Sequence, residues 1–189
     1  MSGGGLVIRP SRDDDLAAIA AIYRHHVLHG VASFEEIPPE QDELAGRRQD
    51  VLAQGLPYLV AERSGRLLGY CYASLYRTRS AYRFTLEDSI YIDAAEVGRG
   101  IGRRLLSTLI DGCTELGYRQ IVAVIGGSDQ WPSIRLHEAL GFTRAGLLPA
   151  VGFKFGSWID IVLMQRPLGA GAAALPIEIG LPKGGGAHG

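Results

Sequence analysis

The stretch SIYIDAAEVGRGIGRRLL, from Ser89 to Leu106, decides the fold of this 189-residue chain. It is typical of a β-strand that leads through a glycine-rich loop into an amphipathic helix. The start of such a helix offers free backbone N–H groups and the positive end of the helix dipole, and both attract an anion. Glycines also let a phosphate come close to the backbone. We therefore predict that the loop binds a diphosphate-bearing cofactor through Gly98, Arg99, Gly100, Ile101, Gly102 and Arg103.

Two familiar phosphate-binding motifs do not fit this loop. No Gly-Lys-Ser/Thr follows the glycines, which excludes a Walker loop. The dinucleotide fingerprint is incomplete, because Arg103, Arg104 and Leu105 follow Gly102 and no acidic residue ends the next predicted strand. A lone Gly-x-Gly is often an ordinary tight turn, so the interpretation depends on the whole strand–loop–helix unit.

The composition is that of a soluble globular domain, with 47% hydrophobic and 21% charged residues and a net charge of −1. This balance gives no reason to expect a nucleic-acid partner or an anionic membrane surface. The first residues lack a signal-peptide pattern, and no apolar run is long enough to span a bilayer. Cys71 and Cys113 have no metal-like spacing, so we expect buried thiols, no metal site and a reducing, cytoplasmic compartment.

Helix and strand patterns alternate unevenly, with antiparallel hairpins first and a β-α-β unit later. This order predicts an α/β (α+β) protein with a mixed, mostly antiparallel sheet and helices on both faces. Helices are expected over residues 11–29, 40–54, 101–117 and 132–140, and strands over 6–9, 58–62, 67–75, 83–93, 118–125, from 141 onward and over 158–166. Residues 1–168 would form one domain, followed by a flexible Gly/Ala/Pro-rich tail over 169–189, of which 175–179 could dock on an edge strand.

Several segments besides the glycine loop carry a family resemblance: Ala81-Tyr82, Thr85-Leu86-Glu87, Ser89-Ile90-Tyr91-Ile92, Val122 to Gly126, Arg135 to Gly141 and Gly152 to Asp160. In these segments the chain resembles the GCN5-related N-acetyltransferases (GNAT), and within them the group that acetylates phosphinothricin and methionine sulfoximine. The resemblance covers about residues 6–168. It implies the GNAT fold, acetyl-CoA as cosubstrate, a small-molecule amine as acceptor, a homodimer and, through phosphinothricin, herbicide resistance.

The resemblance also implies where acetyl-CoA binds. Ile90, Tyr91 and Ile92 would lie along its pantetheine arm and pair with its amides through their backbone, although the same residues could be plain sheet core. Gln130 and Ser133 would contact the cofactor near the start of the following helix.

The acetyl acceptor must lose a proton before its amine can attack a thioester, because most of it is protonated at neutral pH. Glu87, on the strand before the loop, is our candidate general base. Asp88 is adjacent and faces the other side of a regular strand. The residues alone leave both open, and the resemblance selects Glu87.

His137 stands where many of these transferases carry a tyrosine thought to protonate the leaving thiolate. A histidine can act as an acid or as a base near neutral pH. It could equally be a helix histidine that is hydrogen-bonded by a neighbour.

The substrate would be recognised by polar groups around Glu87. Arg77 or Arg79 could pair with a carboxylate, and Tyr82 with a second anionic group, although the segment could also be an exposed basic loop. The resemblance adds Phe34 as a pocket-lining residue, although it could equally be core packing. The full set of candidate substrate-binding residues is Phe34, Arg77, Thr78, Arg79, Tyr82, Glu87, Asp88 and Ser89. Lys154, Trp158 and Asp160 match the family and have a structural or dimer role as readily as a catalytic one.

Two positions differ from the family pattern. Val97 replaces the usual Gln or Arg before the glycines, and Gln130 falls where the family has Asn. They favour an alternative, an acetyl-CoA-binding sensor without turnover, whereas Glu87 and His137 favour an enzyme. A second alternative is an acetyltransferase for a peptide or another amine.

Overall fold

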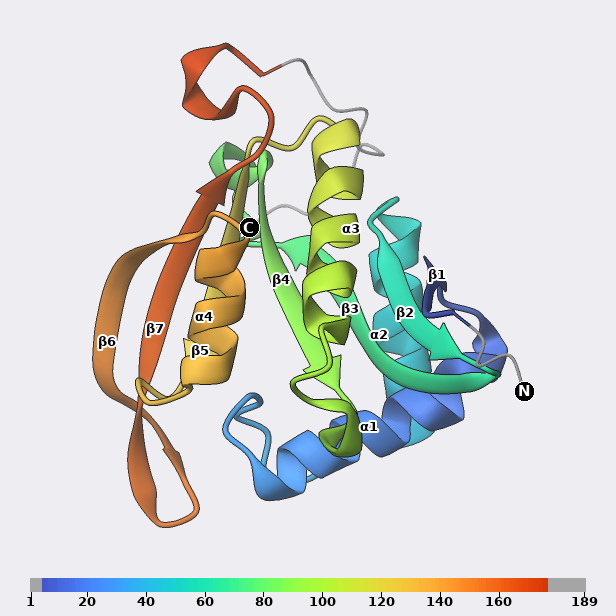
Figure 1. Cartoon of the computed structure of the whole chain (residues 1–189). Helices are drawn as coiled ribbons and strands as arrows, with labels where there is room; N and C mark the ends of the chain where they lie inside the picture. Colours follow the sequence, from blue (N-terminus) through green and yellow to red (C-terminus); the bar gives the residue numbers. More distant parts are fainter. Residues whose placement is uncertain (1–4, 177–189) are drawn as a thin grey trace, which may run out of the picture.

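The computed structural model describes residues 5–176, which form one seven-stranded sheet in the order β1-β2-β3-β4-β5-β7-β6 (Figure 1). Only β4 and β5 are parallel, so the predicted mixed, mostly antiparallel sheet is confirmed. The strands are β1 Val7–Pro10, β2 Tyr58–Arg63, β3 Arg66–Leu75, β4 Thr85–Ile92, β5 Gln120–Gly126, β6 Thr143–Lys154 and β7 Ser157–Pro167. The helices are α1 Leu16–His29, α2 Gln41–Ala53, α3 Ile101–Glu115 and α4 Trp131–Ala139, with 3-10 turns at Asp13–Asp15, Ser80–Tyr82, Ala94–Glu96 and Gly171–Ala173.

Helices cover both faces of the sheet (Figure 1). Tyr91 of β4 packs edge-on against Tyr23 of α1, with ring centroids 5.0 Å apart. Its neighbour Ile90 lies on the opposite side, close to Gly102 of α3 and Leu136 of α4. Side chains of β4 therefore alternate between an α1/α2 face and an α3/α4 face, as the pleat of a strand requires.

Helix α3 forms where the sequence predicts the helix after the glycine loop. Its buried side chains recur every three or four residues and pack on the sheet. The helix begins after Gly100, which has φ +77°, and Gly117 follows its end with φ +89°. Both glycines adopt a left-handed backbone that other residues rarely take.

The two parallel strands separate halfway along their length. Pairing runs from Thr85 opposite Gln120 to Asp88 opposite Ala123, and then stops, although both strands continue. Parallel strands that diverge leave a wedge-shaped gap between them. The β-α-β unit therefore has an opening in the middle of the sheet.

The gap is lined by backbone groups of β4. Residues of an antiparallel strand alternately bond their partner strand and direct their peptide groups away from it. The Thr85 carbonyl accepts a hydrogen bond from the Tyr76 N–H at 3.2 Å, and the Asp93 N–H donates one to the Leu68 carbonyl at 2.9 Å. The odd-numbered residues of β4 therefore bond β3. The peptide groups of the even-numbered residues beyond Asp88, namely Ile90 and Ile92, are therefore directed toward the gap.

The first helix begins later than the sequence predicts. The helix was expected to begin at residue 11, but the Ser11 hydroxyl and carbonyl accept hydrogen bonds from Arg48 at 2.7 and 2.8 Å. The 3-10 turn at Asp13–Asp15 comes first, and α1 starts at Leu16. A buried guanidinium from α2 thus takes the groups that would have capped the helix.

The tail is described only as far as residue 176. Its first part contains the 3-10 turn Gly171–Ala173, and the Leu175 carbonyl accepts a hydrogen bond from Arg119 at 2.8 Å. Residues 177–179, which complete the segment expected to dock on an edge strand, lie outside the described residues. None of the helices in the described part of the chain combines the length and apolar character needed to cross a bilayer.

Candidate active site

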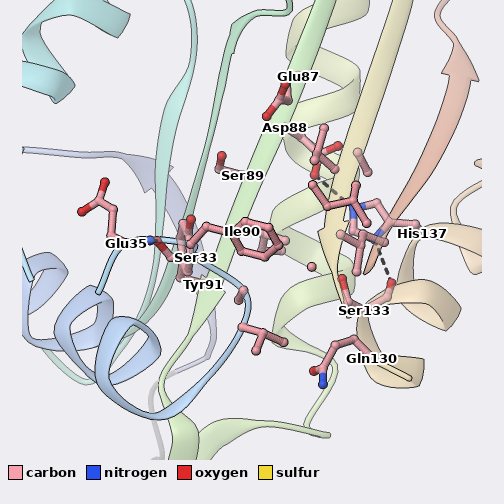
Figure 2. A pocket seen from close by; sticks show the side chains of 18 residues that line it. Ser33, Glu35, Glu87, Asp88, Ser89, Ile90, Tyr91, Gln130, Ser133 and His137 are labelled. Atoms are coloured by element: carbon pink, nitrogen blue, oxygen red, sulfur yellow. Dashed lines mark hydrogen bonds and ion pairs between the residues drawn. The ribbon is translucent and has the colours of Figure 1, made fainter. Parts of the chain in front are cut away.

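A cavity of about 580 Å³ lies at the gap between β4 and β5 (Figure 2). The loop Val31–Glu35 after α1 and the first two turns of α4 complete its walls. Nine predicted site residues line it: Phe34, Glu87, Asp88, Ser89, Ile90, Tyr91, Gln130, Ser133 and His137. The structure therefore brings together residues of three separate segments that the sequence analysis assigned to one site.

The sequence did not identify most of the loop after α1 as part of this site. Besides Phe34, the lining residues that it missed are Val31, Ala32, Ser33, Glu35, Ala123, Val124, Ile125, Gly126 and Ile161. One signal was available at Gly126, a glycine at the end of a buried strand. A Cβ atom there would overlap the Val31 carbonyl and stand 2.7 Å from the Phe34 ring, so only glycine lets the loop approach.

Lys154 of β6 fixes the same loop. Its side chain is buried, and Nζ donates to the carbonyl oxygens of Gly30 at 2.8 Å and Ser33 at 2.7 Å. Burial lowers the pKa of this ammonium group, and the carboxylates of Glu35 and Glu36 oppose the shift. Lys154 therefore has a structural contact with the cavity wall, one of the two roles that the sequence left open.

Phe34 is held between two glycines. A Cβ atom on Gly152 would stand 2.7 Å from its Cζ atom, and the Phe34 ring lies close to Gly126 on the other strand. The side chain is still 39% exposed, because one side of it borders the cavity. The ring is thus a fixed apolar wall of the site.

Glu87 lies on the α1/α2 face of β4 and is half-buried. Burial raises the pKa of its carboxyl group, the Arg77 guanidinium lowers it by less, and the charge of Asp88 raises it again. A carboxylate whose pKa moves toward neutrality is a better general base than an ordinary glutamate. The structure thus places a carboxylate with a raised pKa at the vertex of the gap.

Asp88 lies on the opposite face, as strand alternation predicts, and pairs with His137. Figure 2 shows the contact, in which His137 Nε2 and Asp88 Oδ2 are 3.0 Å apart. His137 Nδ1 is 2.8 Å from the Ser133 carbonyl, and both members of the pair have side chains only 2% exposed. Burial lowers the pKa of His137. The hydrogen bond to Asp88, the negative charge of Asp88 and the hydrogen bond to the Ser133 carbonyl together raise it by more, so the pKa of His137 is raised overall.

The predicted substrate segment between β3 and β4 lies on the surface and does not line the cavity. The Arg77 guanidinium stacks over the Tyr76 ring at 4.2 Å, and Tyr82 packs edge-on against the same ring. Arg77 is still close enough to lower the pKa of Glu87. A substrate role for Arg77, Thr78, Arg79 and Tyr82 stays a prediction.

The glycine loop meets the N-terminus of α3, but its members contribute in different ways. Gly98 and Gly100 have φ +81° and +77°, as a tight loop requires. A Cβ atom on Gly102 would stand 3.2 Å from Leu136, so the absence of a side chain here serves the packing of α3 against α4, while a contact of Gly102 with a diphosphate stays a prediction. The Ile101 side chain belongs to the core, which leaves only its backbone to face a ligand.

Charge around the loop is partly paired. Arg99 is 3.3 Å from Glu96, a buried carboxylate, while Arg103 is exposed at the first turn of α3. Val97 is 56% exposed and contributes no polar group. The anion would therefore be held mainly by backbone N–H groups and Arg103.

These features fit an extended thioester cofactor. His26 of α1 is hydrogen-bonded to the Ile92 carbonyl at 2.8 Å, which leaves the Ile92 N–H and both peptide groups of Ile90 directed toward the gap. An arm with amide groups can pair with them as a neighbouring strand would. The loop before α3 lies beyond the same end of β4 and suits a diphosphate.

Comparisons with known proteins agree with this geometry. A family model described as "Acetyltransferase (GNAT) domain" matches residues 8–163. Phosphinothricin N-acetyltransferase from Alcaligenes faecalis is 60% identical over 169 residues, which are 89% of this chain and 86% of that protein. An L-methionine sulfoximine/L-methionine sulfone acetyltransferase from Salmonella typhimurium is 39% identical over 168 residues, covering 89% of this chain and 98% of that one.

Solved structures support the same assignment. A GNAT superfamily phosphinothricin acetyltransferase from Sinorhizobium meliloti, in complex with acetyl-CoA, superposes with a TM-score of 0.89 at 48% identity and covers 97% of each chain. A putative acetyltransferase from Salmonella typhimurium with its cofactor acetyl-CoA has a TM-score of 0.85 at 39% identity, over 88% of this chain and 96% of that one. This chain therefore belongs to the GNAT family and is an N-acetyltransferase that uses acetyl-CoA.

Proposed function

We propose that the enzyme transfers the acetyl group of acetyl-CoA to the amino group of a small amino-acid analogue such as phosphinothricin, methionine sulfoximine or methionine sulfone. The observation that carries this proposal is Glu87, a half-buried carboxylate with a raised pKa at the vertex of the cleft, next to the charge of Arg77. The names of the relatives from Alcaligenes faecalis and Salmonella typhimurium support the substrate class. Residues 1–168 would form the catalytic domain.

Acetyl-CoA supplies an activated acyl group, and the chain binds and orients it. Ile90 and Ile92 pair with its amides through their peptide groups, and the loop from Gly98 to Arg103 holds its diphosphate. Gln130 and Ser133 contact it from the start of α4. Each charge-assisted bond to the diphosphate contributes about 1.5–3 kcal/mol.

Glu87 takes the proton of the substrate ammonium group, directly or through one water molecule. Arg77 or Arg79 pairs with the substrate carboxylate, and Tyr82 and Thr78 hydrogen-bond its second polar group. Neither cysteine can carry the acyl group, so the amine attacks the thioester carbonyl directly. The C–S bond then breaks, and CoA leaves as the thiolate, which takes up the second proton of the amine nitrogen. Cys71 and Cys113 are buried, and burial raises the pKa of both thiols, that of Cys113 to about 12.

A homodimer and a cytoplasmic location are part of the proposal. The hairpin of β6 and β7 exposes large apolar side chains, which is typical of a surface that another protein chain covers. They are Leu147, Leu148, Val151, Phe153, Phe155 and Trp158. Free thiols at both cysteines suit the reducing cytoplasm, where acetyl-CoA is available.

Thiol release tests the function. Acetyl-CoA turnover is measured with phosphinothricin, methionine sulfoximine, methionine sulfone and unmodified amino acids, beside Glu87→Gln. We expect rapid release with at least one of the first three, and a loss of about 10²–10⁴-fold in the variant, since that is the usual contribution of a general base. Bacteria that express the enzyme should then grow in phosphinothricin if this compound is the substrate.

The alternatives give other results. Turnover only with peptide amines would show that the acceptor is a peptide and not a small amino-acid analogue. Acetyl-CoA binding without turnover on any amine would indicate a sensor. An unchanged rate for Glu87→Gln with a good substrate would refute the role of Glu87 as the base.

A further inference from the structure

The hydrogen-bond partners of His137 define how many protons it holds. The Ser133 carbonyl can only accept, so His137 Nδ1, 2.8 Å away, carries a hydrogen. The contact of 3.0 Å between Nε2 and the Asp88 carboxylate oxygen also needs a hydrogen between the two atoms. The pair therefore contains one proton more than a neutral imidazole beside a carboxylate. That proton belongs to the imidazole, because an ordinary histidine holds a proton far more strongly than an aspartate does.

The neighbours named here do not compensate the charges of Asp88 and His137, so the carboxylate and the imidazolium compensate each other. Cys71 of β3 and Cys113 of α3 lie near Asp88, and burial keeps both thiols protonated. Phe142 packs edge-on against the imidazole at 4.9 Å. Glu87, which precedes Asp88 on β4, has its side chain on the other face of the sheet. A charge buried in such surroundings without its partner is costly, so each member depends on the other.

The position of the pair connects it to the cleft. Asp88 is the last residue of β4 that pairs with β5, so its carboxylate lies where the two strands begin to separate. His137 lies on α4, and the N-terminal turns of that helix supply Gln130 and Ser133 to the cavity. His137 lies in the last turn of α4 and also contacts the Ser133 carbonyl in the first turn, so its bond to Asp88 joins the whole helix to the vertex of the gap.

We propose that Asp88 and His137 form a neutral, buried imidazolium–carboxylate pair that acts as a positioning device, holding α4 against β4 and so setting the width of the acetyl-CoA cleft. Both ring nitrogens of His137 are engaged by acceptors of the protein itself. In this arrangement neither nitrogen delivers a proton to a leaving thiolate, and His137 is a positioning residue, not the catalytic acid. The inference rests on the proposed binding of acetyl-CoA in this cleft, but not on the identity of the amine.

Nitrogen-15 NMR of the histidine rings tests the protonation state directly. The chain has five histidines, and the His137 signals are assigned by their absence from His137→Gln. We expect both ring nitrogens of His137 to remain protonated above pH 6.5, where ordinary histidines lose a proton, and one of them to lose it in Asp88→Asn. A singly protonated His137 in the unmodified enzyme at pH 6.5 would overturn the proposal.

Calorimetric titration with acetyl-CoA tests the positioning role. Asp88→Ala removes the bond, and we expect it to bind acetyl-CoA about tenfold more weakly or worse, since it leaves an unpaired group in the core. Asp88→Asn can still hydrogen-bond a neutral His137 and should retain most of the affinity, which also provides a folded variant if Asp88→Ala does not fold. Asp111→Asn removes an exposed carboxylate from α3 and is the matched control.

The result separates the two proposals. Neither measurement requires an amine, so both remain valid if the enzyme acetylates something other than a phosphinothricin-like compound. Acetyl-CoA affinity that is unchanged in folded Asp88→Ala would refute the positioning role.

Discussion

Replacement of Lys154 with methionine should release the loop that closes the cleft. The buried ammonium group makes two hydrogen bonds to loop carbonyls, and hydrogen bonds of charged groups contribute about 1.5–3 kcal/mol each. Burying the ammonium group offsets part of this sum, as its lowered pKa indicates, whereas methionine is buried at no such cost. We therefore expect a loss of about 2–3 kcal/mol in the free energy of unfolding, which lowers Tm by about 4–12 °C in a chain of this size.

The same substitution should affect one substrate more than the other. The loop brings Ser33, Phe34 and Glu35 to the cavity on the side of Glu87, so the KM for the amine should rise more than the KM for acetyl-CoA. Thermal unfolding and steady-state kinetics with each substrate varied in turn measure the two effects. Arg144→Met, which removes an exposed charge from the same strand, is the control and should change the stability by less than about 1 kcal/mol. A Tm and an amine KM that both match the unmodified enzyme would refute the reasoning.

Three further predictions follow from the site. Gly126→Ala should lower the free energy of unfolding by about 1–3 kcal/mol, because its Cβ would overlap a loop carbonyl, and denaturant titration measures this. The raised pKa of His137 stabilises the fold fully below about pH 6.5, the pKa of an unfolded histidine, and this stabilisation is lost as the pH rises through the pKa in the folded enzyme. Asp88→Asn should remove this dependence of the free energy of unfolding on pH, which denaturant titrations at a series of pH values measure. Arg77→Ala should raise the pKa of Glu87 further, and so move the acidic limb of the kcat/KM profile to higher pH; a limb at the same or lower pH would contradict the charge interaction.

Sequence patterns within one continuous segment were enough to predict the part of the candidate site that this segment forms. The strand, the glycine loop and α3 follow each other in the chain, and the period of a strand was enough to place Glu87 and Asp88 on opposite faces. The packing role of Gly102 could not be predicted, because a bound phosphate and a packed helix both favour a residue without a side chain, and only the position of Leu136 reveals the packing.

Contacts between distant segments could not be predicted in this way. Lys154 binds the loop after α1 across 124 residues of sequence, and His137 meets Asp88 across 49. Such pairings depend on how the helices and the β6–β7 hairpin pack on the sheet. The hydrophobic periodicity of a single segment carries no information about this packing. The loop Val31–Glu35 was therefore missed, apart from Phe34, which only the family resemblance identified.

The separation of β4 from β5 has a consequence for how enzymes of this architecture diversify. In the function that we propose, the cofactor half of the cleft is formed by the main chain of Ile90 and Ile92, which almost any residue can supply. In the same proposal, the acceptor half depends on side chains on the opposite face of the strand, such as those of Glu87 and Ser89, which line the cavity. Substitutions on one face of a single strand can therefore exchange the amine that is acetylated while the hold on the acyl donor is inherited unchanged.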